Sequence, residues 1–167
     1  DGIAVIVNPA NDINQLTTSD LLRIFSGEVV DWKELGGKLN GKVRVISREE
    51  GSGTRKSFDT LVLNGKRLSV QAMYQDSNGT IRETVKSDPN AIGYISIGFL
   101  DKSVKPLLLD GVEASNLNVK SEKYKIMRPV FFLLKSPIKD QTRQFVDYIL
   151  SSEAQNQIGK DGLIPAK

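Results

Sequence analysis

The sequence predicts an α/β protein in which helices flank a mixed β-sheet. Short apolar runs typical of strands recur along the chain, and segments with apolar residues at helical spacing lie between several of them. Hydrophobic residues make up 39% and charged residues 26% of the 167 positions, which is typical of globular proteins. No linker-like or low-complexity stretch divides the chain, so we expect residues 1–167 to form a single α/β lobe.

The N-terminal part begins with a strand followed by a capped helix. The β-branched run IAVIV (3–7) predicts a strand that the turn-forming stretch NPAND ends. The next apolar pattern predicts a helix with Thr17 or Thr18 as its N-cap and Gly27 at its end. Trp32 lies in a polar connection, where we expect it to anchor packing rather than to serve as a ligand platform.

Strand and helix patterns continue to alternate through the middle of the chain. One helix is predicted over Thr54–Leu63, and a shorter one begins at Ser77 and carries Ile81 and Val85 one turn apart. Further strands are predicted for VRVIS (43–47), AIGYISI (91–97) and VKPLLLDG (104–111).

The C-terminal part combines an unusual strand pattern with the strongest helix pattern. YKIMRPVFFLLK (124–135) is strand-like, but Pro129 predicts an edge, a bulge or a change of direction there. A helix is predicted over 138–159, with Gly159 as its stop. Its apolar stripe consists of Phe145, Val146, Ile149 and Leu150.

The absence of two residue types narrows the possible chemistry. The chain contains no cysteine and no histidine, which excludes disulfides, thiolate metal sites and nucleophilic systems that depend on histidine or cysteine. The loop carboxylates Asp12, Asp31 and Asp101 lack metal-ligand spacing. We therefore expect no metal ion and no cofactor.

The charge pattern gives no support to nucleic-acid binding. The formal net charge is +3, but the 23 basic residues are interleaved with 20 acidic ones and no basic block stands out. A mildly basic surface of this kind suits small anions as well as polynucleotides, and a plain solvated surface of mixed charge explains it equally well. No apolar run is longer than VFFLL at 130–134, which predicts a buried strand and is far shorter than the roughly 20 residues of a membrane span.

The stretch SREEGSGTRKSF (47–58) carries the clearest chemical signal. A strand pattern runs into a glycine-rich turn that opens a helix, where free backbone N–H groups and the helix dipole favour an anion. Gly51 and Gly53 permit close approach, and Ser52 and Thr54 add hydroxyl donors. Arg48 can bind an oxyanion through two parallel hydrogen bonds. The structural alternative is a plain turn in which Ser52 or Thr54 acts as N-cap.

Better-known phosphate and nucleophile motifs fail in this stretch. A Walker loop needs glycine directly before its Lys-Ser/Thr pair, and Arg55 stands there. The dinucleotide fingerprint fails because Lys56 takes the place of its last glycine. A hydrolase elbow around Ser52 fails at both flanking glycines, since Glu50 and Thr54 occupy those positions.

At residues 48–54 the sequence REEGSGT resembles the signature of the phosphate-binding proteins that serve ABC-type phosphate importers. The similarity extends in order along nearly the whole chain, through DGIAVIVNPAN, LTTSDLLRIFSGEVVDWKELGG, NAIGYISIG, VKPLLLDG, YKIMRP and SSEAQNQIGKDGLIP. This resemblance implies a lobe of the type II periplasmic-binding-protein kind, with strands at 2–8 and about 126–135 crossing a hinge. It also implies a binding protein and not an enzyme, in an extracytoplasmic location.

The resemblance assigns roles to individual residues. It implies that Arg48, Ser52, Gly53 and Thr54 bind phosphate, with Gly51 shaping the loop. Glu50 occupies the position of an acidic residue that pairs with the arginine, and we expect it to orient Arg48, whereas Glu49 should be a solvated loop acid. Arg55 should face solvent or the rim of the cleft. Receptors for another tetrahedral oxyanion, or an enzyme with Ser52 as nucleophile, are the alternatives.

The family's other lobe supplies further ligands ahead of the segment that resembles DGIAVIV, including an aspartate. None of these ligands has a counterpart in this chain, so the resemblance suggests a C-terminal lobe, separated by design or by proteolysis, that carries half of the ligand site. We expect phosphate and a membrane ABC permease as partners, and we expect the uncovered lobe face to promote self-association.

Overall fold

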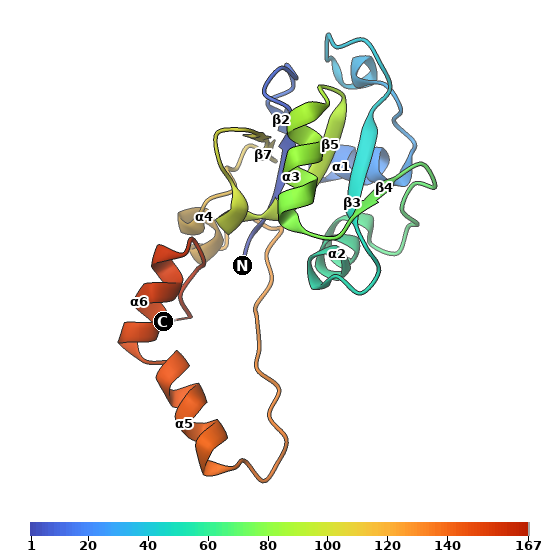
Figure 1. Cartoon of the computed structure of the whole chain (residues 1–167). Helices are drawn as coiled ribbons and strands as arrows, with labels where there is room; N and C mark the ends of the chain where they lie inside the picture. The colour runs from blue at the N-terminus through green and yellow to red at the C-terminus, as the bar shows by residue number, and fades with distance from the viewer. Residues whose placement is uncertain (167) are drawn as a thin grey trace.

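A computed structural model describes residues 1–166 and shows a mixed α/β architecture (Figure 1). A five-stranded sheet has the order β4-β3-β5-β1-β6, and β2 and β7 form a small parallel pair. β3 runs parallel to β4 and β5, whereas β1 runs antiparallel to β5 and β6. The strands are β1 Ile3–Val7, β2 Gln15–Leu16, β3 Arg44–Arg48, β4 Met73–Gln75, β5 Ala91–Ser96, β6 Lys105–Pro106 and β7 Leu108–Leu109.

Helices lie on both faces of this sheet, which confirms the predicted fold class. The α-helices are α1 Thr18–Ser26, α2 Gly53–Phe58, α3 Asn78–Ser87, α4 Asn116–Lys120, α5 Asp140–Ile149 and α6 Ser152–Lys160. Helix α2 continues as a π-helical turn, Asp59–Leu63, and short 3-10 turns cover Trp32–Leu35 and Ile97–Phe99. No helix among residues 1–166 is long and apolar enough to cross a membrane.

The alternation of side chains along β5 explains how both faces are covered. Tyr94 stacks on Phe58 of α2 with ring centroids 4.0 Å apart, and Phe25 of α1 packs against both rings. The neighbouring residue, Gly93, faces the opposite side of the sheet. A Cβ atom at Gly93 would lie 2.8 Å from a methyl carbon of Ile81 in α3. Helix α3 therefore packs directly on one face, while α1 and α2 cover the other.

Several helix ends match the sequence predictions. Thr17 and Asp20 form a reciprocal capping box at the start of α1, and Gly27 ends that helix in the left-handed conformation with φ 84°. Ser77 caps α3 by accepting a hydrogen bond from the Thr80 backbone. Trp32 is fully buried and its Nε1 donates to the Asn90 carbonyl, as expected of a packing anchor.

The single helix predicted over 138–159 is wrong, because two helices occupy this region. α5 ends at Ile149, and Ser151 then caps α6 by accepting a hydrogen bond from the backbone N–H of Ala154. Gly159 lies inside α6, which ends at Lys160 with Asp161 as C-cap, and Gly162 follows with φ 81°.

The expected crossing strand over 126–135 is also absent as a strand. Only Met127 forms a β-bridge, with Gly2, and residues 128–139 run away from the sheet toward α5 without a neighbouring strand to pair with (Figure 1). Leu133 is 95% exposed and Phe131 75% exposed. Helix α6 then brings the chain back beside α4, where the Gly162 carbonyl accepts a hydrogen bond from Asn116.

Candidate anion-binding site

The loop between β3 and α2 has the predicted strand–turn–helix geometry. β3 ends at Arg48, Gly51 takes φ +92°, and α2 begins at Gly53. Ser52 is the N-cap, and its Oγ accepts a hydrogen bond of 3.3 Å from the Arg55 backbone. The binding and capping interpretations of Ser52 are therefore compatible, because one hydroxyl oxygen accepts while its proton stays available.

The Arg48 guanidinium is held by the neighbouring glutamate. Nε and Nη2 donate to the two carboxylate oxygens of Glu49 at 2.9 Å each, and Nη2 also donates to the Asp76 carbonyl at 3.0 Å. The arginine side chain is 12% exposed. Hydrogen bonds with Arg48 lower the pKa of the Glu49 carboxyl, so this acid is ionised at neutral pH. Arg48 is thus fixed with its Nη1 edge directed away from Glu49.

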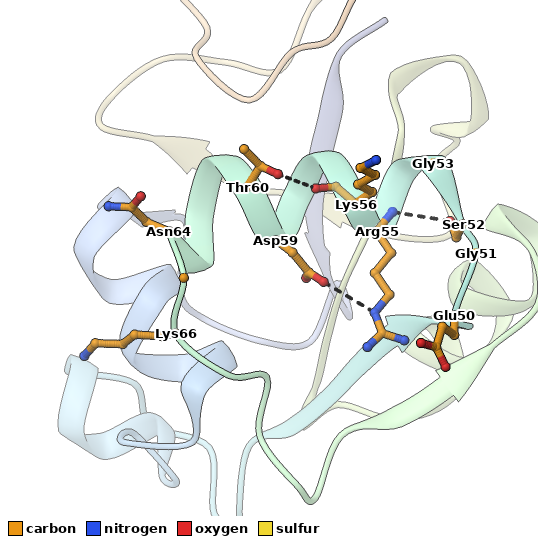
Figure 2. Close-up of a pocket in the computed structure, with 11 residues that line it drawn as sticks. Glu50, Gly51, Ser52, Gly53, Arg55, Lys56, Asp59, Thr60, Asn64 and Lys66 are labelled. Carbon is orange, nitrogen blue, oxygen red and sulfur yellow. Dashed lines mark hydrogen bonds and ion pairs between the residues drawn. The ribbon is translucent and has the colours of Figure 1, made fainter.

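The expected Arg48–Glu50 pair is therefore wrong: Glu49, not Glu50, orients the arginine. Backbone geometry explains the difference, since Glu49 follows the last strand residue while Glu50 already belongs to the turn that Gly51 completes. Glu50 is exposed and lies on the side of the loop that carries Arg55 (Figure 2). Glu49, expected to be a solvated loop acid, is 40% exposed but pairs with Arg48 through both carboxylate oxygens.

A second arginine, which no sequence pattern indicated, reaches the start of α2 from far along the chain. Arg128 Nη2 donates to the Thr54 hydroxyl at 3.0 Å and lies 3.4 Å from a carboxylate oxygen of Asp1. The other Asp1 oxygen accepts a 2.6 Å hydrogen bond from Ser96. No local pattern marks these residues, because the contact joins positions 74 residues apart.

Two positively charged guanidinium groups lie at the site, Arg48 paired with Glu49 and Arg128 paired with Asp1. Burial, followed by repulsion from Arg48, lowers the pKa of Arg128. An arginine nevertheless stays charged near neutral pH, because its ordinary pKa is above 12. Two guanidinium groups that repel one another beside a helix start form an environment in which a bound anion is favourable.

A groove of about 550 Å³ flanks α2 and the π-helical turn beside the site (Figure 2). Arg55 lines it, where its Nε lies 3.5 Å from Asp59 and its guanidinium carbon 5.1 Å from the ring centre of Tyr74. Burial raises the pKa of Asp59. Arg55 is thus a groove residue tied to its own helix rather than a freely solvated one.

The donors of the loop suit an anion better than a metal ion. Ser52 and Thr54 are buried to 8% and 4% exposure, and the N–H groups of Gly53 and Thr54 have no acceptor within the helix at its first turn. Within residues 1–166, no cluster of three acidic, histidine or cysteine side chains could hold a metal ion.

Comparison with known proteins places this geometry in a family. A family model described as a PBP superfamily domain matches residues 1–153. The chain belongs to the PBP superfamily. The phosphate-binding protein PstS of Bacillus subtilis is 33% identical over 98% of this chain and 55% of that protein. PstS 2 of Streptococcus agalactiae is 41% identical over 75% of this chain and 46% of that protein, so the chain spans about half the length of these curated relatives.

Solved structures of PBP-like receptors match the fold closely. One, described as a phosphate ABC transporter substrate-binding protein with bound phosphate from Clostridium perfringens, has a TM-score of 0.92 and 39% identity. The match covers 100% of this chain and 69% of the Clostridium perfringens chain. An ABC-type phosphate transport receptor from Vibrio cholerae has a TM-score of 0.88 and 34% identity. That match covers 98% of this chain and 69% of the Vibrio chain. The names of these relatives describe binding and transport, not catalysis.

Proposed function

We propose that this chain binds inorganic phosphate and belongs to an extracytoplasmic receptor that delivers phosphate to a membrane ABC importer. The observation that carries the proposal is the loop of Arg48, Ser52, Gly53 and Thr54 at the start of α2, in a chain whose 39%-identical structural relative is described with bound phosphate. Gly51 allows the turn of this loop, and Glu49 fixes the orientation of the Arg48 guanidinium.

The loop offers hydrogen-bond donors, as a phosphate oxygen requires. Arg48 contributes charge and the Nη1 edge, the helix start contributes two backbone N–H groups, and Ser52 and Thr54 contribute hydroxyl protons. Such a set binds sulfate as well, because it contains no acceptor-only group, such as a carboxylate, for the proton that phosphate still carries at neutral pH.

We further propose that this loop is half of the ligand site in a single α/β lobe. The chain covers 69% of the phosphate-bound relative, and donors on the uncovered part of such a protein would complete the site. Micromolar binding corresponds to about −8 kcal/mol, which usually needs donors on both sides of the ligand and exclusion of water.

Titration calorimetry of the 167-residue chain tests these proposals together. We expect phosphate to bind with a dissociation constant of about 1 mM or weaker, near −4 kcal/mol, and sulfate to bind equally well. An Arg48→Met variant should abolish the heat of binding. Micromolar binding selective for phosphate would contradict the half-site proposal. The same affinity for phosphate in the Arg48→Met variant would contradict the proposed site.

A receptor for another tetrahedral oxyanion is the remaining alternative within this class. The donor loop alone does not discriminate among such anions, so competition by sulfate and arsenate separates them in a chain that contains the whole site.

A further inference from the structure

We propose that Arg128 is a positioning residue of the anion site, which holds the Thr54 hydroxyl as a hydrogen-bond donor toward the ligand. The inference rests on the proposed phosphate function and assigns a role to a residue outside the glycine-rich loop. It also determines which oxygen of the ligand can carry a proton.

The contact between Arg128 and Thr54 joins two parts of the fold. Thr54 is 4% exposed in the first turn of α2, and Arg128, whose backbone N–H donates to the Asp1 carbonyl at 2.8 Å, precedes the extended segment that leads to α5. Arg128 Nη2 donates to Thr54 Oγ1 at 3.0 Å. A Cβ atom at Gly53 would lie only 2.8 Å from Arg128 Nη1, so the guanidinium lies directly against the start of the helix.

Asp1 and Ser96 hold the guanidinium in this place. Asp1 accepts from Arg128 through one carboxylate oxygen, at 3.4 Å, and from the Ser96 hydroxyl through the other, at 2.6 Å. The Asp1 side chain is 9% exposed. The Ser96 backbone in turn donates to Asn78 at the start of α3. Arg128 is therefore anchored to the end of β5 and not free to swing into solvent.

The hydrogen bond has a chemical consequence for Thr54. A hydroxyl oxygen that already accepts from a charged guanidinium is a weaker acceptor for a second donor, although one lone pair remains, so its own O–H is the group it offers best. Toward an anion at the start of α2, Thr54 then acts chiefly as a donor. It favours an unprotonated oxygen of the ligand there and contributes little to the distinction between phosphate and sulfate.

Removal of Arg128 should therefore change selectivity as well as affinity. In an Arg128→Met variant, the Thr54 hydroxyl can rotate and accept the proton of phosphate, which sulfate lacks. We expect both anions to bind roughly tenfold more weakly for lack of a charged partner, but phosphate to lose less than sulfate. A purely structural role, or a general effect of charge, would weaken the two anions by the same factor.

The test is a double-mutant cycle in which each affinity is measured by amide NMR titration with inorganic phosphate and with sulfate at constant ionic strength. It compares the wild-type chain, Arg128→Met, Thr54→Val and the double variant. We expect Arg128→Met to shift the phosphate-to-sulfate affinity ratio upward, and this shift to vanish in the Thr54→Val background. Arg67→Met, which removes an equal charge from an exposed residue outside this network, should leave the ratio unchanged.

Gly53→Ala provides a second route if Arg128→Met fails to fold. The added methyl group displaces the guanidinium without a change of charge. Because Gly53 itself belongs to the proposed site, the affinity for both anions falls as well, and only the ratio is compared; the same upward shift of the ratio is expected. Independent losses in the cycle together with an unchanged ratio would overturn the inference while leaving the proposed function intact. No phosphate-dependent shift of the Gly53 and Thr54 amides in the wild-type chain would overturn the proposed function and this inference with it.

Discussion

At the scale of single residues, the choice between two adjacent glutamates decides how the anion site is presented. Glu49 accepts two hydrogen bonds from Arg48, while Glu50 points to the groove beside Arg55. A carboxylate beside an anion site need not prevent anion binding. Glu49 occupies only the Nε–Nη2 edge of the Arg48 guanidinium. The remaining edge of Arg48 keeps N–H groups available to an anion, and Arg128 lies against the start of the same helix.

The Glu49–Arg48 pair predicts a specific pH dependence of stability. The folded pKa of Glu49 is lowered, so its contribution is present above the unfolded pKa, near 4.3, and is lost as pH falls through the lower folded value. Glu49→Gln should therefore destabilise the chain at pH 7 and do so less at about pH 3, where more of the carboxyl is protonated. Urea unfolding at both pH values measures this.

Glu50→Gln is the matched control for that experiment, because it removes the same charge from the next position. We expect it to leave the unfolding midpoint unchanged at both pH values. A larger effect of Glu50→Gln than of Glu49→Gln at pH 7 would show that the arginine uses the other partner in solution.

At the scale of elements, the close approach of α3 to β5 is sensitive to an added atom. Gly93 leaves space for Ile81 and Val85, and a Cβ atom there would lie 2.8 Å and 3.3 Å from their methyl carbons. These neighbours belong to a fully buried part of the core, so they cannot move aside into solvent.

Gly93→Ala should lower the free energy of unfolding by about 1–3 kcal/mol through overpacking. Gly79→Ala is the control, because that glycine lies in the first turn of α3 and the nearest atom to its Cβ position is 3.7 Å away. Chemical denaturation of both variants measures the difference. Equal stability of the two alanine variants would mean that α3 can shift away from the sheet at little cost.

At the scale of the whole molecule, the chain has a compact sheet-and-helix body and an exposed apolar segment. Residues 130–134 read VFFLL and are 42–95% exposed, and the side chains Phe145 and Tyr148 of α5 are each 54% exposed. A monomeric protein rarely exposes a continuous apolar stretch of this kind. In a longer relative, additional chain would be available to cover it.

We therefore expect the 167-residue chain to self-associate in a concentration-dependent way in analytical ultracentrifugation. Phe131→Asp should shift the distribution strongly toward monomer, because the charge falls within the apolar segment. Val70→Asp is the control, since Val70 is completely exposed but lies in the compact body. A single sharp monomer of the wild-type chain at high concentration would contradict the proposal.

Much of the fold and part of the site followed from local sequence. The strands at 3–7 and 91–96, the caps at Thr17 and Ser77, and the glycine-rich loop are determined by neighbouring residues. Side-chain spacing, hydroxyl caps and positive-φ glycines act over a few positions, which is why pattern alone located them. The loop from Ser52 to Thr54 belongs to this class.

Contacts between distant residues could be decided only by the tertiary structure. The approach of Arg128 to Thr54, and of Asp1 to Ser96, depends on how β1, β5 and the segment around Met127 and Arg128 are brought together. The loss of strand character over 128–135 depends on the lack of a partner strand, since an extended segment becomes a strand only through ladder hydrogen bonds. The sequence by itself thus determined a strand–turn–helix loop with hydroxyl and backbone donors, whereas the packing of distant segments decided which charged groups surround it.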